Sequence, residues 1–412
     1  MRFLFILDSV EAPAAVNPQL GRRLAAELAD LGHTVHLLEL WDGQTPPPLT
    51  PGTQAHDLPF ADERLMNTAL ENGVKTGSPL PLRLARLARH PSAVCAAVRQ
   101  LVLHKPRRTV DCRAAVERLD ATHHFDCIVA VCAPYRSAFA LETARVGAKK
   151  VLWQLDPYAA NGSYRAPGGY AREIALMNAV DAAFITPTAQ SDYNDPASPL
   201  AVCRSKVHLL GFPCLLPPIY DANLPDPHPP YHCVFCGTLY PGLRTPDFAL
   251  ELFAKLNAPE WDLILAGNGC LQFPAQVAAA KAVLGGRLQT LGPVPPGTAK
   301  LWQSRADVLL SIGNTVDNQL PSKLFEYLGT GKPILHLSYS LRDPVVPYLE
   351  PYPQALVMRA SEGAAPEKVA LMGGWLHALT GRPTPYHKLA AMYPQFTPKV
   401  VAETFLETVQ RL

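Results

Sequence analysis

Short apolar segments alternate with helical segments along the whole 412-residue chain, and this alternation limits the fold more than any other feature. Residues 2–7 form a short apolar run, residues 17–31 place leucines along one helical stripe, and residues 35–40 are apolar again. A strand–helix–strand unit of this kind predicts parallel strands joined by crossovers. We therefore expect an α/β protein.

The same alternation continues after the opening unit, and a proline-rich passage interrupts it once. The later expected strands are 127–131, 150–155, 182–186, 232–237, 261–266, 288–291, 308–312 and 333–337. The interruption at 215–230 has the composition of a stiff linker between domains. We expect two doubly wound Rossmann-like domains, 1–214 and 231–395, with ligands bound beyond the carboxyl ends of the strands and between the domains.

Composition and charge exclude several classes of protein. Apolar residues make up 48% of the chain and charged residues 17%, which supports a core and argues against disorder. The 37 basic residues nearly balance the 35 acidic ones, so charge gives no reason to expect nucleic acid as a partner. The first apolar run is too short for a secretory signal, and no apolar stretch approaches a membrane span of about 18 residues.

Cysteine and histidine residues do not predict a metal site. The nine cysteines are odd in number and mostly lie in apolar runs, which is typical of buried free thiols in a reducing cytoplasm. Cys233 and Cys236 have the spacing of half a zinc site, but residues three apart on a strand point to opposite faces. His123 and His124 form a lone pair before a strand, where we expect surface side chains. The sequence therefore predicts a cytoplasmic protein without a bound metal.

Residues 79–108 depart from the overall charge balance. Basic residues alternate there with apolar ones and no acidic residue intervenes; the basic residues are Arg83, Arg86, Arg89, Arg99, Lys105, Arg107 and Arg108. One interpretation is peripheral contact with an anionic membrane surface or an anionic lipid-linked acceptor. The alternative is a solvated helix pair with an apolar inner face. Nucleic acid is not favoured, because the stretch lacks aromatic residues.

The densest group of functional signals lies at 314–333, directly after an expected strand. Pro321 and Ser322 predict the start of a short helix, whose first turn would present N–H groups and a partial positive charge to a diphosphate. Lys323 would add a cation there, and Glu326 could accept hydrogen bonds from ribose hydroxyls. The alternative is that Ser322 caps the helix while Lys323 and Glu326 lie on its solvated face.

The heptapeptide Pro-Ser-Lys-Leu-Phe-Glu-Tyr, which begins at Pro321, is followed by Gly-Lys-Pro at 331–333. Together these segments resemble the donor site of GT-B glycosyltransferases, specifically the large retaining family 4. That family carries two glutamates separated by seven residues, the second of which binds the nucleotide ribose. Glu326 matches the second glutamate, and Asn318 stands in the place of the first.

Other segments extend the resemblance over most of the chain. Gly237 and Thr238, with Arg244 downstream, are similar to the first strand and loop of the family's nucleotide domain. There a glycine lets the backbone approach the donor phosphates and a base neutralises them. Gly267 lies in a segment that resembles the family's glycine-rich turn. Outside this framework, Arg244 would be interpreted as a surface residue.

In the first domain, Asp156 matches the aspartate that follows a strand in the family, with Leu155 in place of the usual histidine. A carboxylate at a strand end could orient or deprotonate an acceptor hydroxyl, or it could cap the following segment. Asp8 and the loop after it would lie on the same face. The resemblance also implies a last helix, 396–412, that crosses back to the first domain.

The sequence thus predicts a GT-B glycosyltransferase that moves a hexose from a nucleotide diphosphate sugar to a hydroxyl of a carbohydrate or lipid-linked acceptor. The resemblance implies retention of configuration. The lack of an Asp-x-Asp motif in the expected cleft segments predicts that the reaction needs no metal, and we expect no cofactor. The expected catalytic residues are Asp156, Arg244 and Lys323. The expected donor-binding residues are Gly237, Thr238, Arg244, Gly267, Asn318, Pro321, Ser322, Lys323 and Glu326. Two alternatives stay open: a sugar-nucleotide epimerase of the same fold, and a non-catalytic subunit that binds nucleotide sugars.

Overall fold

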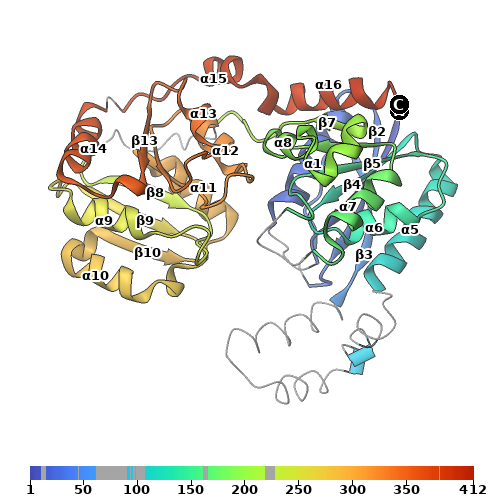
Figure 1. The fold of residues 1–412 in the computed structure, drawn as a ribbon, viewed down its shortest axis with the longest axis horizontal. Coiled ribbons are helices and arrows are strands. Elements are labelled where there is room, and N and C mark those ends of the chain that lie inside the picture. The colour runs from blue at the N-terminus through green and yellow to red at the C-terminus, as the bar shows by residue number, and fades with distance from the viewer. Residues whose placement is uncertain are drawn as a thin grey trace. The chain divides into compact units, whose positions relative to one another are not determined.

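The structure is a computed structural model of the 412-residue chain. It describes residues 1–10, 15–44, 46–61, 107–160, 166–218, 228–379 and 381–412, together with 91, 92, 94, 95 and 98. The described part divides into two compact units, one formed by Met1–Pro213 with Pro398–Leu412 and the other by Cys214–Thr397. Each unit contains one parallel sheet, as Figure 1 shows.

The first unit holds a seven-stranded sheet in the order β3-β2-β1-β4-β5-β6-β7. Its strands are β1 (Arg2–Asp8), β2 (Thr34–Trp41), β3 (Thr53–Pro59), β4 (Cys127–Cys132), β5 (Lys149–Gln154), β6 (Ala182–Ile185) and β7 (Val207–Leu209). Its helices are α1 (Val16–Asp30), α5 (Arg107–His123), α6 (Arg136–Thr143), α7 (Gly169–Asn178), α8 (Gln190–Asn194) and α16 (Pro398–Val409). All its strand pairs are parallel, so the predicted doubly wound sheet is confirmed.

Helices bury both faces of this sheet, which explains the continuous apolar runs of its central strands. On one face, Leu38 and Leu40 of β2 join a core that includes Val116 and Leu119 of α5. On the other face, Glu39, which lies between these two leucines, forms an ion pair with Arg22 of α1. Nε and Nη2 of Arg22 donate to its two carboxylate oxygens at 2.8 and 2.7 Å. Strand β2 therefore packs against α5 on one face of the sheet and contacts α1 on the other.

Strand β3 was not predicted from the sequence. Its segment Thr-Gln-Ala-His-Asp-Leu-Pro is mostly polar and half-exposed. It forms a strand because β2 offers an edge with free backbone hydrogen-bonding groups, and β3 pairs with β2 along its whole length. As the edge strand of the sheet, β3 needs less apolar surface than the central strands.

The second unit holds a six-stranded sheet in the order β10-β9-β8-β11-β12-β13. Its strands are β8 (Tyr231–Cys236), β9 (Trp261–Ala266), β10 (Leu288–Gly292), β11 (Val308–Ile312), β12 (Ile334–Ser338) and β13 (Ala355–Arg359). Its helices are α9 (Asp247–Lys255), α10 (Pro274–Leu284), α11 (Pro296–Arg305), α12 (Lys323–Gly329), α13 (Val346–Leu349), α14 (Pro366–Ala378) and α15 (Tyr386–Met392). The pairs are again parallel, and β8 and β11 are neighbours at the centre.

The last helix, α16, belongs to the first unit although it follows the second unit in sequence. It contacts α1, and the figure shows it among the elements of the first unit (Figure 1). Its Phe405 is fully buried, with ring centroids 5.8 Å from Phe3, 6.0 Å from Phe5 and 5.0 Å from Phe184. This aromatic cluster attaches the end of the chain to strands β1 and β6.

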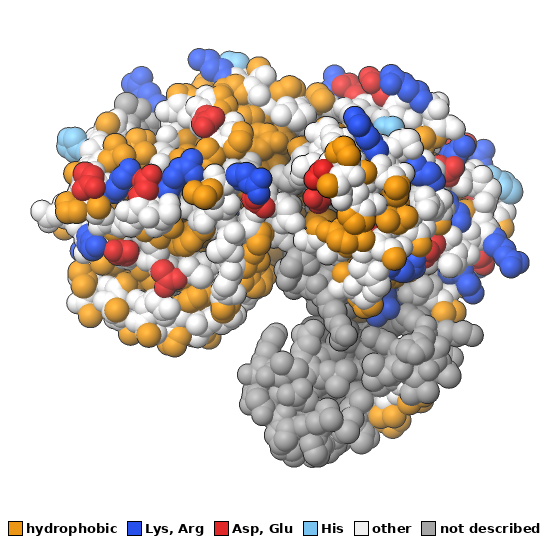
Figure 2. Space-filling view, in the orientation of Figure 1, with side chains coloured by type: hydrophobic (Ala, Val, Ile, Leu, Met, Phe, Trp, Pro, Cys, Tyr) orange, Lys and Arg blue, Asp and Glu red, His pale blue; other side chains and the backbone are white. Residues whose placement is uncertain are grey.

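The state of the cysteines and the distribution of surface charge agree with what the composition predicts. All nine cysteines are free thiols, and every one except Cys95 is buried. Acidic and basic side chains of the described residues intermingle on the face shown in Figure 2. Among the helices of the described part, none combines the length and apolarity needed to cross a bilayer.

Most of the basic stretch at 79–108 lies outside the described residues, including Arg83, Arg86, Arg89, Arg99 and Lys105. Its last two basic residues begin α5. Arg107 is partly exposed and pairs with Asp111 at 2.9 Å. Arg108 is buried against Asp8, with its Nη1 atom 3.0 Å from one carboxylate oxygen. The prediction that Arg108 contributes to a basic surface is therefore wrong, because a buried carboxylate neutralises its charge.

Replacing Phe405 with alanine should destabilise the first unit. The change removes a fully buried ring that contacts three other rings, so we expect a loss of about 3–5 kcal/mol in the free energy of unfolding. Thr404→Ala, at the exposed neighbouring position of the same helix, is the matched control and should change stability little. Chemical denaturation followed by circular dichroism would measure both. Equal stability of the two variants would contradict the proposed attachment.

Candidate functional site

The second sheet contains a topological switch point between β8 and β11. From β8 the chain proceeds outward through β9 and β10, whereas β11 starts the other half of the sheet. In open parallel sheets, ligands bind beyond the carboxyl ends of the strands at this point. The loop after β8 begins at Gly237, and the loop after β11 begins at Gly313. Most of the donor-binding residues predicted from the sequence lie in these two loops or just after them.

The loops after β8 and β9 pack against each other through backbone atoms. The N–H of Gly237 donates to the carbonyl oxygen of Ala266 at 3.0 Å, and the N–H of Leu239 donates to that of Asn268 at 2.9 Å. A Cβ atom on Gly267 would lie 1.8 Å from the carbonyl oxygen of Gly237, and φ of Gly267 is +137°. Glycine is therefore required at 267 by steric contact and by backbone conformation.

Arg244 lies later in the loop after β8, and its side chain contacts the start of this loop and the loop after β11. Its Nε atom donates to Oδ1 of Asn314 at 3.1 Å, and its Nη1 atom donates to the carbonyl oxygen of Thr238 at 3.3 Å. Burial lowers the pKa of Arg244, although a guanidinium stays charged at neutral pH. The structure thus places a fixed, partly buried cation at the switch point.

Asn314 is a site residue that the sequence analysis missed. It is 6% exposed, and it donates to Oε1 of Gln319 at 3.2 Å while it accepts from Arg244. It therefore connects the loop after β11 to the guanidinium. Its position directly beyond a predicted strand was the available signal, but an asparagine there also suits an ordinary turn.

Helix α12 carries the remaining predicted donor residues. It has seven residues, and Ser322 precedes it without a side-chain capping hydrogen bond. Nζ of Lys323 lies 2.8 Å from Oε2 of Glu326, so both charged groups lie on one face of the helix. The side chains are 40% and 19% exposed, which leaves them accessible to a ligand. Asn318 and Pro321 are half-buried in the segment that leads into this helix.

Tyr327 fixes α12 against the end of β8. It is buried, and its hydroxyl oxygen accepts from the backbone N–H of Cys236 at 2.9 Å. Burial raises the pKa of the Cys236 thiol to about 11, opposed by the positive charge of nearby Lys323. Lys323 therefore lies close to the end of β8, where Gly237 begins. The sequence motif contained Tyr327, but only the fold shows that its hydroxyl supports the site.

A buried chain of hydrogen bonds lies beneath the same edge of the sheet. Nδ1 of His336 is 2.9 Å from the Ser311 hydroxyl, and Nε2 is 3.0 Å from Oδ2 of Asp343. Burial would raise the pKa of Asp343, but the hydrogen bond and charge of His336 hold it below its usual value. His336 and Asp343 are almost fully buried, so this Ser–His–Asp chain supports strands β11 and β12 and cannot reach a substrate.

In the first unit, Asp156 lies directly beyond β5. Its Oδ2 atom accepts from the amide nitrogen of Asn17 at 3.1 Å, and the same amide nitrogen lies 3.1 Å from the carbonyl oxygen of Ala133. Burial raises the pKa of Asp156, opposed by the Asn17 hydrogen bond. A carboxylate with a raised pKa is a better proton acceptor than an exposed aspartate. Asn17 was not predicted as a site residue.

The backbone around Asp156 is held by a buried polar network. The Tyr135 hydroxyl donates to the carbonyl oxygen of Asp156 at 2.6 Å. Glu173 is fully buried and accepts from the Ala159 N–H at 2.9 Å, three residues after Asp156, and from the side chains of Gln154 and Tyr193. The loop that presents Asp156 is therefore fixed by side chains from several elements.

Asp8, which also ends a strand on this face, is not available to a substrate. Both of its carboxylate oxygens lie within 3.2 Å of Arg108 Nη1, and the side chain is buried. Asp8 ends β1, at the carboxyl end of the strand as expected, and its charge is paired with that of Arg108.

Similar proteins were found among solved structures. No protein-family model and no curated protein sequence matches the chain. HepE from Anabaena, solved with UDP and glucose, superimposes with a TM-score of 0.62 at 12% identity over 100% of both chains. Sucrose-phosphate synthase from Thermosynechococcus elongatus superimposes with a TM-score of 0.61 at 14% identity, over 100% of this chain and 98% of that one.

A putative UDP-N-acetylglucosamine 2-epimerase from Listeria monocytogenes also superimposes, with a TM-score of 0.57 at 12% identity over 99% of this chain and 95% of that one. At these identities the likeness concerns the fold alone. The chain has the GT-B fold. Glycosyltransferases and 2-epimerases share this fold, so the fold by itself does not decide between transfer and epimerisation.

Replacing Gly267 with alanine should destabilise the second unit, because the new Cβ would overlap the carbonyl oxygen of Gly237. We expect a loss of more than about 1 kcal/mol in the free energy of unfolding. The matched control is Gly297→Ala in helix α11, where no atom lies within 4 Å of the added Cβ and φ is not positive. The control should be neutral or stabilising. Thermal unfolding of both variants would measure the difference, and equal unfolding temperatures would contradict the close packing of the two loops.

Proposed function

We propose that the chain is a glycosyltransferase of the retaining family 4 type. It transfers a hexose from a nucleotide diphosphate sugar to an acceptor hydroxyl. The observation that carries this proposal is the fixed cation at the switch point: Arg244 is held by Asn314 and Thr238 beyond the central strands. A partly buried guanidinium with its fork of N–H donors suits a diphosphate better than it suits a neutral ligand.

In the proposed donor site, different residues of the second unit bind different parts of the nucleotide sugar. Gly237, Thr238 and Gly267 let the backbone come close to the phosphates, and Arg244 and Lys323 neutralise their charge. Glu326, which pairs with Lys323 at 2.8 Å, binds the ribose hydroxyls. Asn318, Pro321 and Ser322 form the segment beside the sugar. Because HepE was solved with UDP, a uridine diphosphate sugar is the first donor to test.

The reaction breaks the bond between the anomeric carbon and a diphosphate oxygen and forms a bond from the acceptor oxygen to that carbon. The bonding electrons leave with the diphosphate, so negative charge develops near Arg244 and Lys323 as the bond breaks. Cations fixed in advance stabilise this charge without reorganisation. The acceptor hydroxyl must lose a proton, and we assign its orientation or deprotonation to Asp156, whose pKa is raised.

The acceptor class belongs to the same proposal. We propose a carbohydrate or lipid-linked hydroxyl as the acceptor, and contact of residues 79–108 with an anionic membrane surface. The proposed surface rests on the sequence of this stretch, because the two basic residues that the structure describes, Arg107 and Arg108, pair with Asp111 and Asp8. A cytoplasmic enzyme that acts at the inner face of a membrane would fit the basic composition of the remaining stretch.

A 2-epimerase is the second candidate, because the fold is also that of the putative Listeria enzyme. Incubation of the purified chain with UDP-hexoses, followed by analysis of the products, separates the two. Release of nucleoside diphosphate together with a glycosylated acceptor supports transfer. A free 2-epimer formed without an acceptor supports epimerisation. Specific nucleotide-sugar binding without any turnover would favour a non-catalytic subunit.

The Glu326→Ala variant should bind nucleoside diphosphates more weakly. A hydrogen bond to a charged group contributes about 1.5–3 kcal/mol, so we expect an increase in Kd of about tenfold to a hundredfold. The control Glu251→Ala removes the acid of an exposed Lys–Glu pair of the same length, 2.8 Å, on helix α9. Calorimetry with UDP and with its 2′,3′-dideoxy analogue is the sharpest measurement. The variant and the wild type should bind the dideoxy analogue equally, and an equal loss for both ligands would refute the ribose role.

The Arg244→Ala and Lys323→Ala variants should lose turnover more than donor affinity. Both cations act mainly on charge that develops in the transition state, so we expect kcat to fall by roughly a hundredfold while Kd changes less. Lys255→Ala, which removes the base of the exposed pair on α9, is the control. Single-turnover kinetics with a saturating donor would measure the effect. Normal turnover of both variants would place the diphosphate elsewhere.

A further inference from the structure

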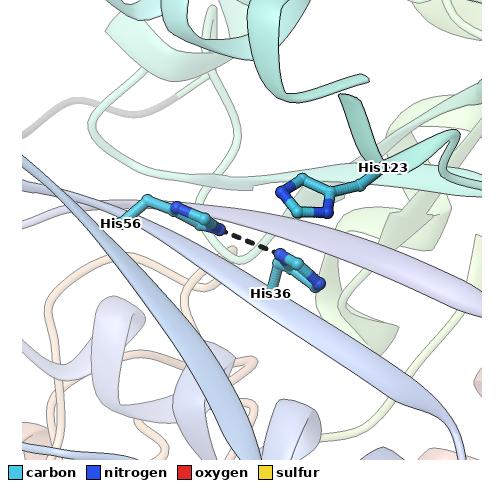
Figure 3. Close-up of side chains that lie close together, drawn as sticks. All are labelled: His36, His56 and His123. Carbon is cyan, nitrogen blue, oxygen red and sulfur yellow. Dashed lines mark hydrogen bonds between the residues drawn. The ribbon is translucent and has the colours of Figure 1, made fainter. Parts of the chain in front are cut away.

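Three histidines from separate elements meet at one point of the first unit. His36 lies early in β2, His56 lies in the edge strand β3, and His123 ends α5. In the parallel register, His56 of β3 lies opposite Leu38 of β2. The side chain of Leu38 faces α5, and so does that of His36, because residues two apart on a strand point to the same face. The fold therefore directs all three imidazoles into the same layer, as Figure 3 shows.

The three rings are close enough to share one ligand. Nδ1 of His36 lies 2.9 Å from Nε2 of His56, and one ring nitrogen from each of the three residues lies within 4.8 Å of the others. The ring centroid of His123 is 4.4 Å from that of His36 and 5.7 Å from that of His56. His36 is buried, and the other two are half-buried. His124 is exposed, as expected, whereas His123 is only half-exposed.

The three rings come from separate elements, and Figure 3 shows Nδ1 of His36 and Nε2 of His56 facing each other in a hydrogen bond of 2.9 Å. The simpler alternative is an aromatic cluster with Phe125, whose ring lies 5.1 Å from that of His36. That alternative and the hydrogen bond between His36 and His56 explain the packing of these rings, and the observation that favours a shared ligand is the ring nitrogen of His123 within 4.8 Å of the other two.

We propose that His36, His56 and His123 bind a divalent transition metal ion of the zinc type, with water at a fourth position. Neutral imidazole nitrogens suit Zn²⁺, Cu²⁺ and Ni²⁺, whereas Mg²⁺ and Ca²⁺ prefer oxygen ligands. Zinc–nitrogen bonds of about 2.0–2.1 Å place tetrahedral ligand atoms about 3.4 Å apart. The observed separations of 2.9 to 4.8 Å bracket this value, so shifts of the ring nitrogens by up to about 1.4 Å would complete the site.

The cluster lies at the other end of the strands from the proposed acceptor residue. His36 lies near the amino end of β2, whereas the proposed acceptor residue Asp156 follows the carboxyl end of β5 in the same parallel sheet. An ion held by the three rings would link the edge strand β3 to β2 and to the last turn of α5. This inference is independent of the proposed transferase activity, because the metal contacts none of the residues assigned to donor or acceptor.

Metal titration of the full chain, purified without a polyhistidine tag and stripped with a chelator, tests the proposal. We expect one equivalent of Co²⁺ to bind and to give the visible absorption of a four-coordinate nitrogen-rich site, and Zn²⁺ to displace it. Zn²⁺ should also raise the unfolding temperature, because it binds the folded state. Failure of Co²⁺ and Zn²⁺ to bind in a competition assay with a chromophoric chelator would overturn the proposal.

The variants His56→Gln and His123→Asn each remove one ligand and replace half-buried side chains, which the fold tolerates better than a change at buried His36. Loss of one ligand should weaken Zn²⁺ binding by at least about tenfold to a hundredfold, the range found for removing groups that only support a ligand. His124→Asn is the matched control, because His124 is exposed and has φ of +51°, a conformation that asparagine accepts. Equal Zn²⁺ affinity of the two ligand variants and the control would refute the site.

Discussion

Parallel pairing of every strand is the constraint on which the rest of the structure depends. Parallel neighbours cannot be joined by tight turns, so each strand is followed by a crossover, and the crossovers bury both faces of the sheet. The same pairing places all strand carboxyl ends at one edge. In the second unit this edge carries Gly237, Asn314 and the start of α12, and in the first unit it carries Asp8 and Asp156. Chemistry at the ends of strands is therefore a consequence of how the backbone pairs.

Buried polar contacts then decide which groups at that edge stay available. Asp8 and Arg108 neutralise each other inside the first unit, so neither can bind a substrate or a membrane. Asp156 accepts a single amide hydrogen bond from Asn17 and keeps a raised pKa, which suits a proton acceptor. In the second unit, Arg244 is fixed by two oxygen acceptors that carry no formal charge, so its positive charge is available to an anion. Two arginines that look alike in sequence thus differ in their partners, one being paired with a carboxylate and the other bonded to uncharged oxygens.

Apolar runs and short motifs made much of the fold predictable. The central strands of both sheets were placed within one or two residues, because strands buried on both faces are almost continuously apolar. Strands β3, β7 and β13 were missed, since each lies at the edge of its sheet and needs little apolar surface, and the sequence of β3 resembles a loop. In the donor region, the motif around Lys323 and Glu326 was visible in the sequence, but the supporting roles of Asn314 and Tyr327 were not. Asn314 bonds to Arg244, 70 positions away, and Tyr327 bonds to Cys236, 91 positions away, so neither contact leaves a local pattern in the sequence.

The sequence by itself determined the class of fold, the alternation of strands and helices, and the residue types at the strand ends, because these follow from local periodicity and backbone conformation. Only the tertiary structure decided which charges are paired and which residues converge. His123 looked like one of two surface histidines, yet the helix end, the edge strand and β2 bring it to His36 and His56. Sequence patterns extend over a few residues, whereas a binding site is defined by distances of a few ångströms. Only folding brings residues that are far apart in the sequence to such distances.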